Sequence, residues 1–215
     1  TPMKRKHPLW FLLPLALLLS LAACSNQAPA ADAPQEAAAY TVAPYTPTEQ
    51  EQTLLQAYEL TQDNTVAFTF QNPEEILGLF VQIYRLGEDG TWQNVDDIAV
   101  GSLLPPQAEG LITLQLEDSE AIIARVLCQG SLQVGSAGPL EGDFVARTQR
   151  FLTEPQPIQR NEPIPIALLA YAEAGNPAAQ DDTLGKISLQ DYFTPENLTG
   201  PDLVQAVTVT FSETA

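Results

Sequence analysis

Short runs of alternating apolar and polar residues recur throughout residues 49–215. The clearest lies at 203–211, where Val207, Val209 and Phe211 alternate with hydroxyl-bearing residues. A period of two puts the apolar side chains on one face of a β-strand. Further strands are predicted at residues 66–70, 79–86, 111–116, 122–128, 144–152 and 164–171.

Turn signals such as Glu88-Asp89-Gly90 and Gly175-Asn176-Pro177 separate these runs. No segment shows the sustained 3.6-residue period of a long amphipathic helix. The 167 residues of this region are enough to build one hydrophobic core. We therefore expect an all-β fold, a single antiparallel β-sandwich of immunoglobulin-like or jelly-roll-like type over residues 49–215.

Residues 49–61 fit two interpretations. Thr48 and Glu51 have the spacing of a helix capping box, and the apolar residues that follow fit one helical face. They also fit a strand that ends in an Asp-Asn turn before residues 66–70, and we favour the strand. Residues 177–200 are predicted to be a long connection with a short helix after Thr194.

A basic cluster and an apolar run precede the predicted domain. Lys4-Arg5-Lys6 is followed by 15 residues from Leu9 to Ala23, interrupted by Pro14. As a helix these 15 residues would span about 22 Å. A helix that crosses a bilayer needs ~20 residues, so this run is too short to cross it. The pattern predicts a secretory signal peptide over residues 1–23.

The apolar run ends in Leu21-Ala22-Ala23-Cys24, which resembles the lipobox of bacterial lipoproteins. The resemblance implies cleavage between Ala23 and Cys24 and a diacylglycerol on the sulfur of Cys24. Two acyl chains anchor a protein stably, whereas one is marginal. We expect a membrane-anchored protein on the extracytoplasmic face of the cell membrane. A plain signal peptide with a chance cysteine is the alternative.

Residues 24–48 are rich in Ala and Pro and show no apolar periodicity. Such a segment cannot bury a core, so we expect a disordered tether between the lipid and the domain.

Cleavage after Ala23 would change the composition. It would leave six Lys and Arg against 27 Asp and Glu, a net charge of −21 rather than −18, and no histidine. The absence of histidine excludes Ser-His-Asp and Cys-His catalysis and His-ligated zinc. The negative charge opposes binding to phosphate backbones, so we expect no nucleic-acid partner.

Cys128 lies in the apolar run 122–128. With Cys24 taken by lipid, no intramolecular disulfide is expected, and Cys128 is interpreted as a buried, inert thiol.

Carboxylates are the plentiful reactive groups, with clusters at Asp96-Asp97, Glu117-Asp118-Glu120 and Asp181-Asp182. Two of them could serve a glycosidase, and loop carboxylates could hold Ca²⁺. Adjacent acids arise by chance in a chain with 27 of them, so no catalytic, cofactor or metal residue is assigned. Trp92 or Tyr192 could stack on sugars, but packing within the fold is the expected role.

The run from Tyr84 to Trp92 predicts a strand, a tight turn and an aromatic residue on the return strand. It is similar to hairpins in uncharacterised surface lipoproteins of anaerobic Gram-positive bacteria. That resemblance implies no particular activity.

We expect a lipid-anchored binding or scaffolding module with a protein or glycan ligand, not an enzyme, and without a cofactor apart from the diacylglycerol. The alternatives are an envelope glycan hydrolase and a solute-binding component of an uptake system. The hydrolase predicts two Asp or Glu residues lining one cleft. The binding module predicts an exposed aromatic or apolar patch without such a pair.

Overall fold

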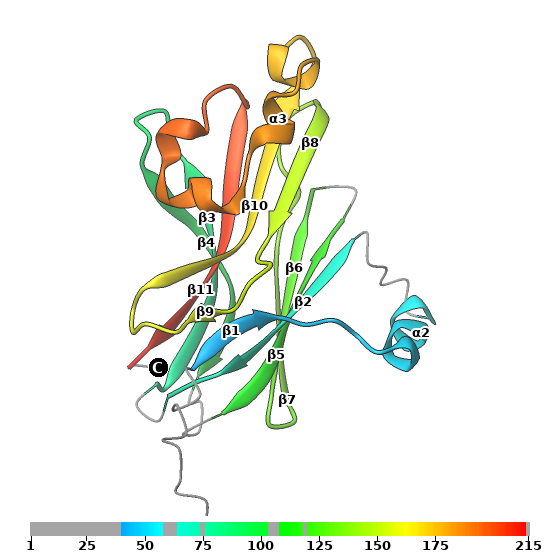
Figure 1. Cartoon of the computed structure of the whole chain (residues 1–215), viewed down its shortest axis with the longest axis vertical. Coiled ribbons are helices and arrows are strands. Elements are labelled where there is room, and N and C mark those ends of the chain that lie inside the picture. Colours follow the sequence, from blue (N-terminus) through cyan, green and yellow to red (C-terminus); the bar gives the residue numbers. More distant parts are fainter. Residues whose placement is uncertain (1–39, 58–63, 74–75, 103–107, 118–119, 214–215) are drawn as a thin grey trace, which may run out of the picture. The chain divides into compact units, whose positions relative to one another are not determined.

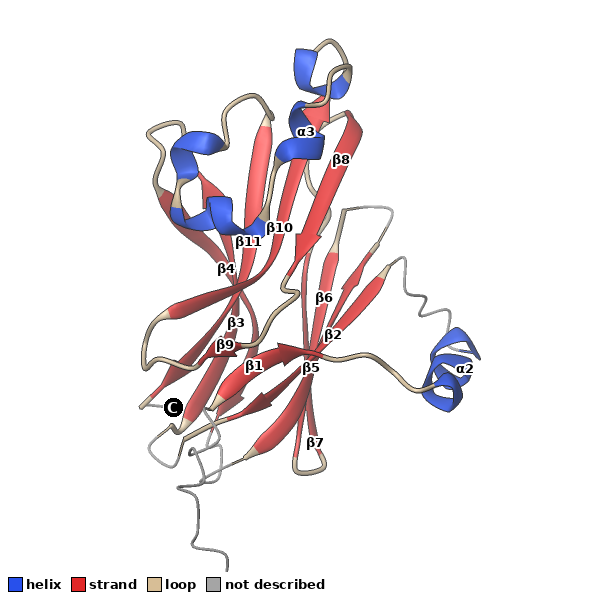
Figure 2. Ribbon diagram, in the orientation of Figure 1, coloured by secondary structure: helices blue, strands red, loops and turns tan. Residues whose placement is uncertain are grey.

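The computed structural model describes residues 40–57, 64–73, 76–102, 108–117 and 120–213. Within these residues the chain forms two antiparallel sheets of six and five strands that pack against each other (Figure 2). The predicted all-β antiparallel β-sandwich is confirmed.

The six-stranded sheet has the strand order β7-β6-β5-β2-β1-β9. Its pairings are antiparallel throughout; for example, Ile112 on β5 lies opposite both Phe68 on β2 and Val126 on β6. The strands are β1 (Thr41–Pro44), β2 (Thr65–Gln71), β5 (Glu109–Leu116), β6 (Ile122–Cys128), β7 (Ser131–Ala137) and β9 (Gln156–Pro157).

The five-stranded sheet has the order β4-β3-β11-β10-β8, which places the two longest buried strands at or beside its centre. All of its pairings are antiparallel as well. Its strands are β3 (Gly78–Leu86), β4 (Trp92–Ser102), β8 (Phe144–Phe151), β10 (Pro163–Glu173) and β11 (Leu203–Ser212).

The main core lies between the sheets. Val207, Val209 and Phe211 on β11 are fully buried there, as the alternation predicts. The Phe211 ring meets Phe70 of the other sheet edge-on, with ring centroids 5.7 Å apart. This arrangement buries large apolar side chains from both sheets, which is the main stabilising term of such a fold.

A second core covers the outer face of the five-stranded sheet. Leu168 and Ala170 on β10 and Val204 and Ala206 on β11 are buried against the connection at 177–200. Because both faces of β10 are covered, its sequence is almost continuously apolar rather than alternating. Figure 1 shows the connection (orange) beside β10 and β11. It contains η3 (Pro177–Ala179), α3 (Thr183–Lys186), η4 (Leu189–Phe193) and η5 (Pro195–Asn197).

The prediction of a strand over residues 49–61 is wrong for the part that the structure describes, because Glu49–Ala57 forms helix α2. The capping box decides the outcome. The Glu51 carboxylate accepts hydrogen bonds from the backbone N–H and the hydroxyl of Thr48, at 2.8 and 2.7 Å. These local bonds satisfy polar groups at the helix N-terminus, so the helix needs no partner strand.

The predicted tether boundary at residue 48 is also wrong, because β1 occupies Thr41–Pro44. β1 pairs with β2 on one side and β9 on the other, and Val42 is fully buried. A four-residue strand with one inward apolar side chain is too short for its alternation to be recognised. Residues 24–39 of the predicted tether lie outside the described residues.

Candidate functional site

A pocket of about 460 Å³ lies between the five-stranded sheet and the segment 138–143 that carries the chain from β7 to β8. One wall comes from β3, β4 and β11. The other comes from Ala137 and the residues after it, through Glu141. The pocket has the size of small-molecule sites, which occupy roughly 300–1,000 Å³.

The sheet wall continues the inner face of the main core. On β11, Leu203 and Gln205 share the face of Val207, because they are separated from it by even numbers of residues. Gln205 lies opposite Arg85 on β3 in the register. Arg85 and Gln205 therefore lie on the core-facing side of the sheet, at positions where apolar side chains would extend the core.

Gln205 is 3% exposed, and its side-chain oxygen Oε1 is buried without a hydrogen-bond partner among the described residues. Leaving such an acceptor unsatisfied costs about 1–3 kcal/mol. Among the residues that the structure describes, four other buried polar atoms also lack a partner, and none of them belongs to a residue that lines this pocket: Asn72 Oδ1, Gln115 Oε1, Arg125 Nη1 and Thr208 Oγ1.

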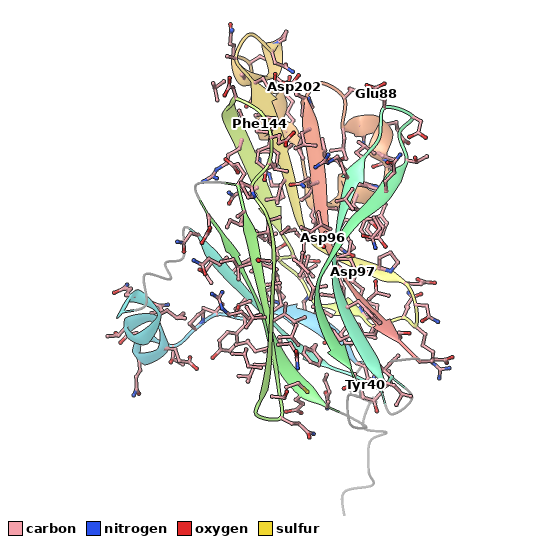
Figure 3. All side chains as sticks on the ribbon, turned by 180° about the vertical axis from the view of Figure 1, so that it is seen from behind. Tyr40, Glu88, Asp96, Asp97, Phe144 and Asp202 are labelled. Carbon is pink, nitrogen blue, oxygen red and sulfur yellow. The ribbon has the colours of Figure 1, made fainter. Side chains whose placement is uncertain are left out.

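Five exposed charged side chains line the same pocket as Gln205. Four acids and one arginine line the pocket, from β3, β4, the 138–143 segment and the neighbouring ends of β10 and β11: Arg85, Asp96, Glu141, Glu173 and Asp202. In Figure 3, Asp96 and Asp202 are labelled on their separate segments, together with Phe144 at the start of β8. The chain is thus folded so that acids distant in sequence share one opening.

The rim of the pocket is fixed by backbone contacts. Asp202 accepts a hydrogen bond from the backbone N–H of Glu173 through Oδ2, at 2.7 Å. Gly142 has φ 144°, and a Cβ there would lie 2.7 Å from the Phe144 ring. Phe144 in turn packs on Tyr171, with ring centroids 5.2 Å apart. Glycine therefore lets the segment approach the ring closely.

The structure separates the Asp96-Asp97 pair. Asp96 lines the pocket, whereas Asp97 Oδ1 accepts hydrogen bonds from Gln82 and Asn94 at 2.8 and 3.0 Å. The register shifts between Ile83 and Tyr84, so that β4 has an irregularity beside Asp96. Only one member of this cluster can therefore contribute to the pocket.

The other two acidic clusters have structural contacts. Glu120 forms an ion pair with Arg147 at 3.1 Å, and Asp118 lies outside the described residues. Asp181 Oδ1 accepts a hydrogen bond from the backbone N–H of Thr183 at 2.8 Å. No group of three or more His, Cys, Asp or Glu side chains able to hold a metal ion occurs within the described residues.

The aromatic candidates pack on each other. The rings of Trp92 and Tyr192 stack with centroids 5.1 Å apart, and the indole Nε1 donates to the Tyr192 carbonyl at 2.9 Å. Burial, with a smaller contribution from Tyr84, raises the pKa of the Tyr192 hydroxyl to about 12. The predicted packing role is confirmed, since the pair holds the 177–200 connection against β4.

Cys128 is buried, and burial raises the pKa of its thiol. This agrees with the interpretation of an inert thiol. Ala23 and Cys24, the predicted cleavage and lipid-attachment residues, lie outside the described residues.

Sequence reasoning missed most residues of the pocket, including Arg85, Glu141, Glu173 and Asp202. One signal was present in the pattern of β11. Gln205 interrupts the series of inward apolar residues that Val207 and the residues after it continue. A polar residue at an inward position of a strand is unusual and marks either a buried hydrogen bond or a site.

Comparisons with protein families, with curated proteins and with solved structures find no match to this chain. In the part of the chain that the structure describes, no helix is long and apolar enough to cross a membrane. What the protein does must therefore be inferred from the pocket and from the N-terminal sequence.

Proposed function

We propose that the protein is a lipid-anchored extracytoplasmic binding module that takes a small polar ligand into this pocket. The observation that carries the proposal is the 460 Å³ pocket, whose lining combines apolar side chains with Gln205, Arg85 and four carboxylates. Apolar walls with a few convergent polar groups are typical of ligand sites.

The anchor in this proposal is supported by sequence alone. The lipobox Leu21-Ala22-Ala23-Cys24 would give a diacylglycerol on Cys24 after cleavage behind Ala23. We expect Cys24→Ala to release the protein from the membrane fraction or to block its processing. Fractionation of cells followed by mass spectrometry of the N-terminus measures this. A Cys24→Ala protein that stays membrane-bound at mature size would contradict the anchor.

A second candidate is an envelope glycan hydrolase, because the pocket gathers four carboxylates in one opening. A hydrolase requires at least two Asp or Glu residues lining one cleft, and the lining of this pocket meets that condition. Hydrolysis needs one carboxyl group as acid and one as nucleophile or base. Asp202 is held in place by a hydrogen bond from the backbone N–H of Glu173 to its Oδ2.

The solute-binding component of an uptake system has no specific support. Receptors of that kind have two α/β lobes, whereas the described residues form two antiparallel sheets.

Ligand binding can be tested on the mature, lipidated protein in detergent micelles. A panel of sugars, amino sugars, amines and Ca²⁺ is added, and the melting temperature and the Trp92 emission are recorded. A ligand at one hundred times its Kd stabilises the native state by about 2.7 kcal/mol. For a domain of this size that raises the melting temperature by about 5–10 °C.

The matched variants are Arg85→Met, inside the pocket, and Glu154→Gln, at an exposed position that does not line it. We expect the first to change the affinity, because it removes a charge from the wall of the pocket, and the second to leave it unchanged. Binding that Arg85→Met and Glu141→Gln both leave intact would overturn the pocket as the site. Cleavage of a glycan that Glu141→Gln or Glu173→Gln abolishes would favour the hydrolase.

A further inference from the structure

We infer that the protein dimerises with a second copy of this chain, in such a way that the β7 strands of the two copies pair antiparallel, edge to edge. β7 ends the six-stranded sheet and, among the residues that the structure describes, pairs with β6 alone. The backbone N–H and C=O groups of alternate residues on such a strand point away from its one partner, so another strand can bond to them. This surface is separate from the proposed ligand pocket.

β7 lacks the features that protect the other sheet edges from such pairing. Natural edge strands are blocked by charged residues, by proline, by irregular pairing or by their short length. β4 has two acids and pairs irregularly with β3, β8 has two arginines, and β9 consists of two residues. The seven residues of β7 include no charged residue and no proline, and their register with β6 is unbroken.

A tight turn holds this edge in place. Gln129 and Gly130 join β6 to β7 with φ of 47° and 81°, and a two-residue hairpin turn of type I′ requires positive φ at both central positions. Such a turn matches the twist of the strands on either side and fixes their register. The edge is therefore already in the conformation that a partner strand would bind, which lowers the entropic cost of pairing.

The outer face of the sheet beside this edge is apolar and exposed. Leu132 lies opposite Leu127 on β6, and Val134 follows two residues later on the same face. Leu127, Leu132 and Val134 are 43%, 55% and 58% exposed. Within the described residues they are three of the seven exposed large apolar side chains, and they adjoin one another on one hairpin. Clustered apolar exposure indicates an interaction surface, whereas scattered exposure does not.

Charge and sequence pattern identify the partner as a second copy. The 15 residues from Val126 to Leu140 carry no charge, in a chain whose net charge is −18. Two such acidic molecules repel each other, and an uncharged edge is where they can approach most closely. A partner strand must be extended, uncharged and apolar at alternate positions, and β7 itself meets these three conditions.

Antiparallel pairing about a two-fold axis at Gln133 brings the two apolar surfaces together. Leu132 of each copy then lies opposite Val134 of the other, and the outer faces of the two hairpins become continuous. The axis lies in the exposed part of the strand, since residues 131–134 are exposed and Ala137 is partly covered. An interface of this length is small, so we expect a weak dimer, which the proposed lipid anchor strengthens by concentrating copies in one membrane.

Disulfide trapping in intact cells that express the full chain tests the pairing. Residues directly opposite each other in an antiparallel pair have Cα atoms about 4.5–5.5 Å apart, a distance that a disulfide can bridge. Under mild oxidation we expect Gln133→Cys to form a covalent dimer about tenfold or more faster than Val145→Cys, a control at an exposed position of the edge strand β8. The wild type, whose Cys128 is buried, gives the background.

Sedimentation of the purified full chain in a density-matched detergent measures the dimer itself. Val134→Glu places a carboxylate beside the two-fold axis in each copy, so we expect it to raise the dissociation constant about tenfold or more. Val145→Glu is the matched control and should leave the constant unchanged. Both side chains are exposed, so neither substitution should lower the melting temperature much. Raising the salt concentration should strengthen the wild-type dimer, because salt screens the repulsion between two acidic molecules.

Three results would overturn the inference. They are a wild type that stays monomeric up to about 1 mM, equal trapping rates for Gln133→Cys and Val145→Cys, and a dimer that Val134→Glu leaves intact. Trapping of Gln133→Cys in a disulfide with a different protein would overturn the second copy as the partner of β7.

Discussion

At the scale of single residues, the pocket depends on one glycine. Gly142 has φ 144°, and an added Cβ would lie 2.7 Å from the Phe144 ring and 3.2 Å from Glu173 Oε1. We expect Gly142→Ala to destabilise the protein by about 1–3 kcal/mol, because the new methyl group strains the backbone and displaces the ring. Urea unfolding measures the change in free energy, and ligand titration should show weaker binding.

Gly138 provides the matched control in the same segment. It also lines the pocket, its φ is not in the left-handed region, and an added Cβ would meet no atom within 4 Å. Gly138→Ala should therefore change the free energy of unfolding by less than about 0.5 kcal/mol. Equal effects of the two substitutions would contradict the role assigned to Gly142.

The sequence could have predicted part of the pocket at this scale. Alternation along β11 predicts that Gln205 lies on the same inward face as Val207. Asp96 and Asp97 are indistinguishable in sequence, and only the irregular pairing of β4 with β3 directs Asp96 to the pocket. Nothing in the sequence places Glu141 near Glu173, because their approach depends on the path of the 138–143 segment between two sheets.

At the scale of elements, the 177–200 connection is fastened by Arg150 on β8. Its Nε donates to the Ile187 carbonyl at 2.7 Å, and its Nη2 donates to the Gly185 carbonyl at 2.9 Å. These carbonyls lie in and just after the short helix α3, where a cation is also favourable. We expect Arg150→Met, which retains the apolar stem, to cost about 2 kcal/mol.

Hydrogen exchange locates this effect. Arg150→Met should speed exchange of backbone amides in residues 183–198, with little change in the six-stranded sheet. Arg150→Lys should rescue only part of the loss, because an ammonium cannot reproduce the planar fork of the guanidinium. Faster exchange spread evenly over both sheets would show that Arg150 acts on global stability instead.

The elements that were predicted correctly are those with a buried face. Each of these strands has apolar residues that face a core, and the pattern of these residues is visible in the sequence: β2, β3, β5, β6, β8, β10 and β11. β7 was missed because it is an edge strand with most residues exposed, so no apolar alternation is required of it. Helix α2 was missed because two patterns competed, and its capping box was the deciding signal.

At the scale of the whole molecule, acidity has two opposing effects on stability. The expected mature chain has a net charge of −21, and mutual repulsion destabilises a compact state. Lowering the pH relieves this repulsion. Several carboxylates nevertheless have lowered pKa values in the folded state, because hydrogen bonds favour their charged form: Glu51, Asp89, Asp181 and Asp191. Protonation of these groups destabilises the fold.

Asp191 allows the second effect, the loss of stability when a hydrogen-bonded carboxylate is protonated, to be tested separately. Burial alone would raise its pKa, but hydrogen bonds from the backbone and hydroxyl of Ser188 and from Asn197 overcome burial and lower it. A carboxyl whose pKa is lower in the folded state adds stability that is complete above its unfolded pKa, ~3.9. That stability is lost as the pH falls through the lower, folded pKa.

We therefore expect the melting temperature of the wild-type protein to fall as the pH is lowered from about 4 to about 3, in 0.5 M NaCl. The salt screens the general repulsion, so that specific carboxylates dominate the change. Asp191→Asn has no charge to lose at this position, so its melting temperature should fall less steeply than that of the wild type over the same range. Parallel pH profiles for the two proteins would show that the hydrogen bonds to Asp191 in η4 do not contribute to acid sensitivity. In that case the loss would lie with the other three carboxylates, all of which are bonded within local turns or caps.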